Sequence, residues 1–163
     1  MSIGADRIRF QISNTFGGSD LPITAASVAL PQGGMPGVAG IDTSTLKTLT
    51  FSGQESISIP RGQVAYSDPI DFKVAPQSMV TISLYLQRGQ QGNSITGHPG
   101  SRTTSWMAKG NHVKDATISG GNTKHWYFVA GVEAWAPAST KALMILGDSI
   151  TDGRGSDDDK NNR

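Results

Sequence analysis

The residues Arg7-Ile8-Arg9-Phe10-Gln11-Ile12-Ser13 alternate strictly between polar and apolar side chains. Successive side chains of a β-strand point to opposite faces, so this stretch predicts a strand that buries Ile8, Phe10 and Ile12. Helix signals are nearly absent from the rest of the chain. The stretch therefore favours a β protein whose sheet has one buried face and one solvated face.

Further short segments rich in Val, Ile, Thr and aromatic residues follow, separated by turns that contain Gly, Pro, Asn or Asp. We predict strands over residues 23–30, 46–51, 56–59, 70–74, 79–86 and 125–135, with one short strand near 102–107 in the polar, glycine-rich stretch 87–122. Such regular punctuation favours an antiparallel two-layer β-sandwich of the jelly-roll type over a barrel. Residues Ala136-Pro137-Ala138 close the last strand, so we predict that the sandwich domain covers residues 1–138.

A different pattern begins after this boundary. Lys141-Ala142-Leu143-Met144-Ile145-Leu146 is an apolar run without alternation, which is typical of a strand buried on both faces of a parallel α/β sheet. The polar tail Asp157 to Arg163 does not supply the crossover helix that a parallel strand requires. We therefore interpret residues 139–163 as the incomplete start of a second, α/β/α domain.

Length and composition exclude several classes of protein. The chain has 163 residues, 14 basic and 13 acidic, and no cysteine. The near-neutral balance gives no basis for binding to nucleic acid, and the absence of cysteine excludes disulfides and thiolate zinc sites. No apolar run approaches the roughly 20 residues of a membrane-spanning helix, and the first residues do not resemble a signal peptide. We expect no metal and no cofactor, and the oligomeric state stays open.

The strongest candidate for chemistry is the stretch Gly147-Asp148-Ser149-Ile150-Thr151-Asp152-Gly153, directly after the predicted buried strand. A serine at the carboxyl end of a parallel strand lies where α/β proteins bind ligands, and free N–H groups of its turn can stabilise an oxyanion. Gly147 permits a tight turn, and Asp148, Thr151 or Asp152 can hydrogen-bond to the local backbone. We predict that Ser149 is a nucleophile and a backbone N–H oxyanion donor, with Gly147, Asp148, Thr151, Asp152 and Gly153 as its supporting turn.

A second stretch serves as an internal control for this motif. The sequence of Gly92-Asn93-Ser94-Ile95-Thr96 is nearly the same as that of residues 147–151. It follows a polar loop, however, so we interpret Ser94 as an ordinary turn serine. The Gly-x-Ser-x-Gly elbow of α/β-hydrolases does not fit, because Thr151 stands where that elbow has glycine. The prediction for Ser149 thus depends on the preceding strand as much as on the motif.

The stretch from Gly147 to Gly153 resembles the first block of the SGNH, or GDSL-type, hydrolase family. Residues 7–17, 67–69, 83–86 and 126–128 also resemble a branch of that family with a β-sandwich-like region before this block. The resemblance implies a carboxylic-ester hydrolase that works through an acyl-enzyme on Ser149, with an ester substrate such as an acylated carbohydrate, in a secreted full-length protein. In that family a glycine and an asparagine from later blocks complete the oxyanion hole, and an Asp-x-x-His activates the serine.

None of these later blocks occurs in the chain. The three histidines, His98, His112 and His125, all precede the serine motif, and we interpret them as ordinary loop or strand residues. A serine nucleophile needs a base within hydrogen-bond reach, so we expect the chain by itself to be inactive or nearly so.

A non-catalytic module that binds carbohydrate, or another partner, is the alternative function. Its sugar-stacking platform would use the aromatic residues Trp106, Trp126, Tyr127, Phe128 and Trp135, although alternate positions of one strand favour the core for most of them. We interpret the Asp157–Asp159 run as a solvated charge cluster, and the glycine-rich stretches 33–37 and 153–155 as turns.

Overall fold

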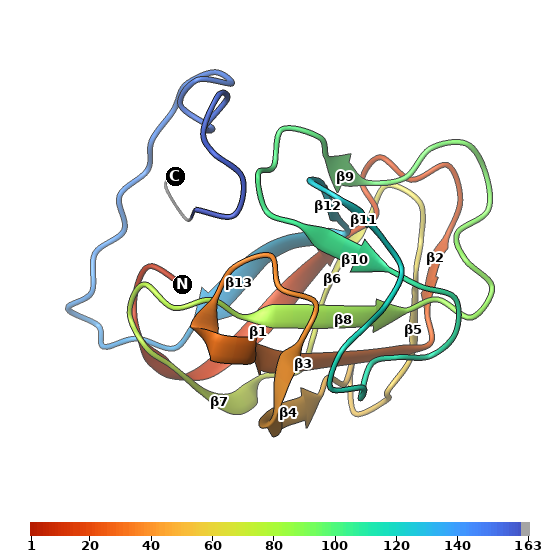
Figure 1. Ribbon diagram of the computed structural model, residues 1–163, viewed down its shortest axis with the longest axis horizontal. Helices are drawn as coiled ribbons and strands as arrows, with labels where there is room; N and C mark the ends of the chain where they lie inside the picture. The colour runs from red at the N-terminus through yellow and green to blue at the C-terminus, as the bar shows by residue number, and fades with distance from the viewer. Residues whose placement is uncertain (161–163) are drawn as a thin grey trace.

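The computed structural model describes residues 1–160 and shows a mainly β chain with antiparallel sheets (Figure 1). This confirms the predicted class. The last three residues of the predicted second domain, 161–163, lie outside the described part. Residues 1–160 contain no α-helix, only the 3-10 turn η1 (Gln32–Gly34), and hence no helix long and apolar enough to cross a membrane.

The first sheet is built around β1 (Ala5–Ser13). Strand β13 (Val129–Ala134) pairs with one edge of β1, while β6 (Val64–Tyr66) and β7 (Ile70–Val74) pair with the other. Ile8, Phe10 and Ile12 are fully buried, and the polar residues between them are at least partly exposed. The predicted alternation is therefore confirmed from Arg7 to Ile12, whereas Ser13 at the end of the strand is buried as well.

The second sheet has β3 (Ala25–Pro31) between β4 (Ile41–Thr48) and β8 (Thr81–Tyr85). The predicted strand 23–30 is in fact divided, because β2 (Leu21–Ile23) pairs with β5 (Ile57–Ile59) instead. The change of partner occurs at Thr24, whose N–H donates to the carbonyl of Tyr85 and whose hydroxyl accepts the N–H of Gln87.

Strand β3 also lacks the alternation of β1, since residues 26–29 are all buried. The hydroxyl of Ser27 donates a 2.5 Å hydrogen bond to the carbonyl of Val113, so a loop 86 residues further along the chain covers its outer face. Because the cover comes from so far away, the local sequence carries no sign of it.

The two sheets and the β2–β5 pair contribute side chains to one hydrophobic core. Its buried members are Ile8, Phe10, Ile12, Leu21, Ile23, Ala26, Val28, Leu49, Phe51, Ile59, Phe72 and Val74. The predicted strand 46–51 overlaps the end of β4 at residues 46–48, and the buried Leu49 and Phe51 follow that strand. Predicted strands 56–59, 70–74 and 79–86 correspond to β5, β7 and β8, whereas β6 was not predicted.

The predicted long strand 125–135 is broken at Phe128, which has φ of 65°, a left-handed conformation that is rare for a bulky residue. Before the break, β12 (Trp126–Tyr127) pairs with β9 (Gly97–His98), and after it β13 pairs with β1. Nearby, β10 (Ser105–Met107) pairs with β11 (Gly121–Thr123). The stretch 87–122 is thus mostly loop, with the expected short strand at β10.

Residues 135–160 form no strand, and they run along the outside of the molecule as a coil before turning back toward β9 and β10 (Figure 1). Side chains 143–146 are between 71% and 95% exposed. The prediction of a buried strand over residues 141–146 is therefore wrong for the described structure. A strand buried on both faces needs paired neighbours and covering helices, and residues 1–160 provide neither for this segment.

Candidate functional site

The turn around Ser149 is ordered by its own hydrogen bonds. The carboxylate of Asp148 accepts the N–H of Ile150 at 2.9 Å, the Asp148 carbonyl accepts the N–H of Asp152 at 3.0 Å, and the Ser149 carbonyl accepts the N–H of Arg154 at 2.7 Å. Asp148 thus makes the local backbone contact expected of it.

Gly147 is required by close packing in the same turn. A Cβ on this residue would lie 2.1 Å from the Oγ1 of Thr151, well inside contact distance. Thr151 therefore packs against the glycine instead of bonding to the backbone, and any larger residue at position 147 would displace it.

Ser149 itself is exposed, and neither its hydroxyl nor its N–H makes a hydrogen bond within residues 1–160. Ser94 differs, since its hydroxyl donates to the carbonyl of Phe16 at 2.7 Å and its carbonyl accepts the N–H of Gly18 at 2.8 Å. The near-copy of the motif thus has a structural role, whereas the Ser149 hydroxyl is presented to solvent.

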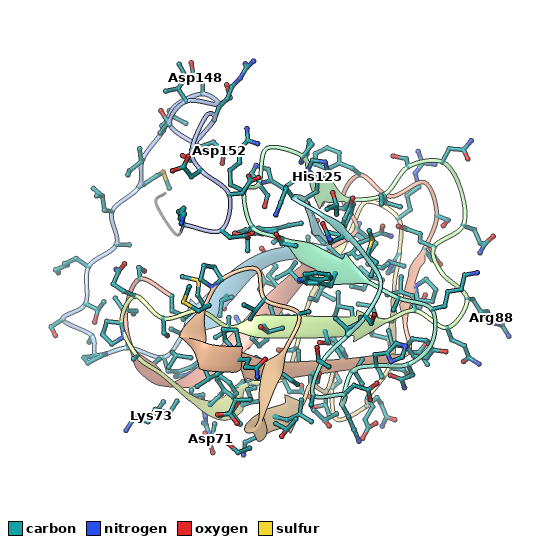
Figure 2. The ribbon with its side chains drawn as sticks, in the orientation of Figure 1. Asp71, Lys73, Arg88, His125, Asp148 and Asp152 are labelled. Atoms are coloured by element: carbon teal, nitrogen blue, oxygen red, sulfur yellow. The ribbon has the colours of Figure 1, made fainter. Side chains whose placement is uncertain are left out.

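Asp152 connects this turn to the β strands. Its Oδ2 lies 3.0 Å from the Nε2 of His98 in β9, and the His98 ring lies 6.1 Å from the ring of Trp126 in β12. In Figure 2, Asp148 lies at the outer end of the C-terminal loop and Asp152 follows it along the loop. The supporting turn therefore contacts the β domain through the side chain of Asp152, for which the sequence predicts only a bond to the local backbone.

No histidine is hydrogen-bonded to Ser149 within the described residues. His98 faces Asp152, and both ring nitrogens of His112 are engaged, Nδ1 by Asp115 at 2.7 Å and Nε2 by the Lys109 carbonyl at 2.8 Å. The Asp115 carboxylate, followed by this carbonyl, raises the pKa of His112. The Nδ1 of His125 is buried and has no hydrogen-bond partner among residues 1–160. The arrangement brings together no serine, base and orienting acid.

The carboxylate of Asp159 is bound in a recess of the β domain. It accepts the N–H of Thr104 at 2.7 Å, the hydroxyl of Thr104 at 2.7 Å and the Nζ of Lys124 at 3.1 Å. Burial raises the pKa of Asp159, but the Thr104 and Lys124 hydrogen bonds outweigh it, so the pKa is lowered. The interpretation of Asp157–Asp159 as a solvated cluster is therefore wrong for Asp159, whose partners lie 35 to 55 residues away and leave no local signal in the sequence.

Two tryptophans expected in the core are exposed. Trp126 is 45% and Trp135 is 47% exposed, whereas Phe128 packs against the core. The guanidinium of Arg9 lies 5.7 Å from the ring centre of Trp135 and 4.6 Å from that of Tyr66. These three side chains form a strip, which we call the Trp135 strip, on the solvated face of the first sheet.

A cleft of about 1030 Å³ lies between β8 and β13, which are the edge strands of their sheets. It is lined mainly by apolar side chains of β8, β10, β12 and β13, among them Ile82, Leu84, Trp106, Tyr127 and Val132. Mostly apolar concave surfaces of this size are common ligand sites. Trp106 thus contributes to the cleft and not to an exposed platform.

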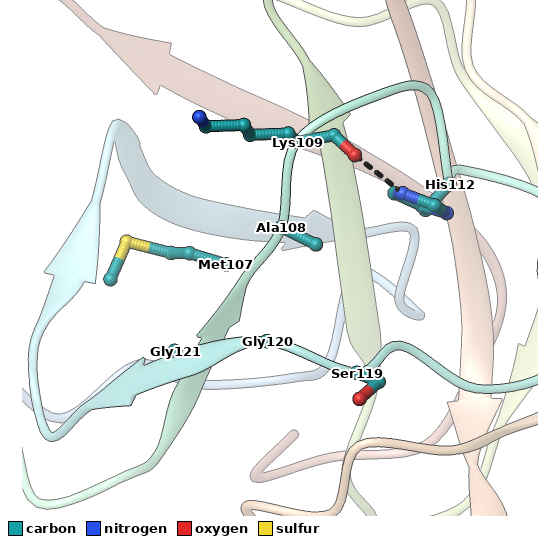
Figure 3. Close-up of a pocket in the computed structure, with 7 residues that line it drawn as sticks. All are labelled: Met107, Ala108, Lys109, His112, Ser119, Gly120 and Gly121. Carbon is teal, nitrogen blue, oxygen red and sulfur yellow. Dashed lines mark hydrogen bonds between the residues drawn. The ribbon is translucent and has the colours of Figure 1, made fainter.

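A smaller open pocket of about 560 Å³ adjoins β10 and β11 (Figure 3). Its lining residues are Met107, Ala108, Lys109, His112, Ser119, Gly120 and Gly121. In Figure 3 the Lys109 amine and the Ser119 hydroxyl come from separate segments and do not point toward one another, and the His112 ring is held by the Lys109 carbonyl. The pocket therefore contains no converging set of reactive groups.

Comparison with known proteins adds no assignment, since no family model and no curated protein matches the chain.

Proposed function

We propose that Ser149 is the nucleophile of a carboxylic-ester hydrolase of the SGNH type, in which the β domain precedes the hydrolase domain. The proposal rests on the motif, on its exposed hydroxyl and on the apolar run before it. The finer fold belongs to the same proposal: residues 1–138 are a jelly-roll-like sandwich and residues 139–163 begin an α/β/α domain.

The observation that carries the proposal is the exposure of Leu143, Met144, Ile145 and Leu146, each at least 71% accessible to solvent. Burial of a large aliphatic side chain contributes about 1.5–3 kcal/mol, so four of them would contribute about 6–12 kcal/mol. Soluble proteins seldom leave such a contiguous run unpartnered. A sheet that takes up this run as a strand would place the Ser149 turn at its carboxyl edge, which is the position that acyl transfer needs.

In this mechanism the Ser149 hydroxyl attacks the ester carbonyl, the alcohol leaves, and water cleaves the acyl-enzyme. The Ser149 N–H would donate one hydrogen bond to the oxyanion. In the family that the motif resembles, the base and the other donors come from later blocks, and no Asp-x-x-His occurs in the 163 residues given.

Hydrolysis of p-nitrophenyl acetate tests whether Ser149 is the nucleophile and whether it needs a base from the later blocks. We expect no turnover by the 163-residue chain above that of Ser149→Ala, because one oxyanion donor without a base gives little rate enhancement. We expect the product of the whole reading frame to be active, inactivated by Ser149→Ala and unaffected by Ser94→Ala. If the Ser149→Ala variant kept its activity, as Ser94→Ala is expected to do, the role of Ser149 would be contradicted.

The Trp135 strip favours a second candidate function, which is carbohydrate binding by the β domain. Two aromatic rings on the solvated sheet face, with Arg9 close to both and Gln11 donating to the Tyr66 hydroxyl at 2.6 Å, offer stacking surfaces and polar groups together. A glycan array would test this with Trp135→Ala, and with Phe16→Ala as the control because Phe16 is exposed outside the strip. Binding that both variants retain equally would exclude the strip.

A further inference from the structure

The recess that holds Asp159 is a defined feature of the β domain. Thr104 immediately precedes β10 and Lys124 immediately follows β11, and pairing of Ser105 with Thr123 holds the two side by side. The Nζ of Lys124 donates to the Thr104 hydroxyl at 2.5 Å, and that hydroxyl donates to the Asp159 carboxylate. The charge of Lys124 thus strengthens the hydrogen bond that Thr104 makes.

The other wall of the recess requires a glycine. A Cβ on Gly37 would lie 2.1 Å from the Oδ1 of Asp159, and Gly37 has φ of 71°. The indole N–H of Trp106 donates to the Gly37 carbonyl at 2.9 Å and fixes the position of this wall. The bonds that build the two walls, Lys124 to Thr104 and Trp106 to Gly37, involve no residue of 147–160.

Asp159 enters this recess in an unfavourable backbone conformation. Its φ is 56°, in the left-handed region, and its N–H donates to the carbonyl of Arg102 at 2.8 Å. A non-glycine residue adopts this conformation where surrounding contacts compensate for it. The recess therefore recognises both the carboxylate and the peptide N–H of the residue it holds.

The carboxylates of residues 157–159 do not occupy every donor of the nearby cations, Arg102 and Lys124. Arg102 is 4.0 Å from Asp158, and within residues 1–160 the buried Nε of Arg102 has no hydrogen-bond acceptor. Buried donors of this kind are normally paired. An acidic segment that is not tethered to the coil 135–147 has the freedom to satisfy Arg102 as well.

We propose that Gly37, Thr104 and Lys124 form a binding site for the aspartate side chain of an acidic peptide segment, and that Asp159 occupies this site in cis. The tail competes with a segment of the same chemistry supplied in trans. Thr104 and Gly37 also line the large cleft, so the occupied site lies on its border. The residues that form the site, Gly37, Thr104 and Lys124, belong to the β domain, and Ser149 is not among them.

The test uses the full chain with Asp159→Ala, which empties the site, and a labelled capped peptide with the sequence of residues 154–160. Fluorescence anisotropy should show that this variant binds the peptide about ten-fold more tightly than the unchanged chain, whose site is occupied. Asp158→Ala is the matched control, because it removes a neighbouring carboxylate and leaves the cis contact in place. It should bind the peptide no better than the unchanged chain does.

Two further measurements decide between recognition and non-specific charge attraction. A peptide with asparagine in place of its last aspartate should bind Asp159→Ala about ten-fold more weakly, and adding Thr104→Val should have a similar effect. The Thr104 amide signal should move when the peptide is added to Asp159→Ala. Equal binding by the unchanged chain and Asp159→Ala, or equal binding of both peptides, would overturn the proposal.

Discussion

A matched pair of leucine truncations tests how the chain divides into a packed domain and an unpartnered segment. Leu21 in β2 is fully buried in the shared core, whereas Leu146 before the Ser149 turn is 95% exposed. Both changes, Leu21→Ala and Leu146→Ala, remove the same atoms. Any difference in the free energy of unfolding therefore reports the surroundings of the two side chains.

We expect Leu21→Ala to lower the free energy of unfolding by about 3–5 kcal/mol, because it loses its transfer free energy and leaves a cavity. Leu146→Ala should change it by less than about 0.5 kcal/mol, as exposed substitutions do. For a chain of this size the first change corresponds to a fall in Tm of roughly 6–20 °C.

Urea unfolding followed by far-UV circular dichroism measures both values, and equal urea dependence of the two variants confirms that they unfold to comparable states. A cost above about 1 kcal/mol for Leu146→Ala would show that segment 143–146 is packed. A cost below about 1 kcal/mol for Leu21→Ala would refute the position of β2 in the core.

Three further outcomes follow from buried or paired polar groups. Asn14 is fully buried, donates to the Ser19 and Ile59 carbonyls and accepts from Gln90, so Asn14→Ala should cost about 2–4 kcal/mol in urea unfolding. The pKa of His112 is raised by Asp115, so its contribution to stability is present below pH of about 6.5 and is lost as pH rises through the raised value; an NMR titration should show a lower pKa in Asp115→Asn. The pKa of Asp68 is lowered by hydrogen bonds from the Thr50 hydroxyl and from the N–H groups of Gly53 and Ser52, so its contribution is present above pH of about 3.9 and is lost on acidification; Asp68→Asn should flatten the acid limb of a Tm against pH curve.

The sequence predicts best the strands that have one buried face and one solvated face. β1 is the clearest case, because Arg7, Arg9 and Gln11 are at least partly exposed while Ile8, Phe10 and Ile12 between them are buried. β3 shows no such alternation, because the loop at Val113 covers its second face. The break at Phe128 is also invisible locally, because the strand changes partner there while its residue types stay the same.

The same distinction applies to the candidate site. The local features of the Ser149 turn, namely the Asp148 contact and the need for glycine at position 147, follow from residues two to four positions apart. The contacts of Asp152 with His98 and of Asp159 with Thr104 join residues more than 50 positions apart, and no spacing rule predicts them. Segment 141–146 has the composition of a buried strand, but burial depends on neighbours that residues 1–160 do not supply.

Labelling with a fluorophosphonate probe tests the central claim most directly, because such probes react with activated serine nucleophiles and not with ordinary hydroxyls. In a product that also contains the later family blocks, mass spectrometry should place the label on Ser149, and Ser149→Ala should abolish it while Ser94→Ala retains it. The 163-residue chain should stay unlabelled. A whole product that stays unlabelled, or one that carries the label on any serine other than Ser149, would contradict the assignment of Ser149 as the nucleophile.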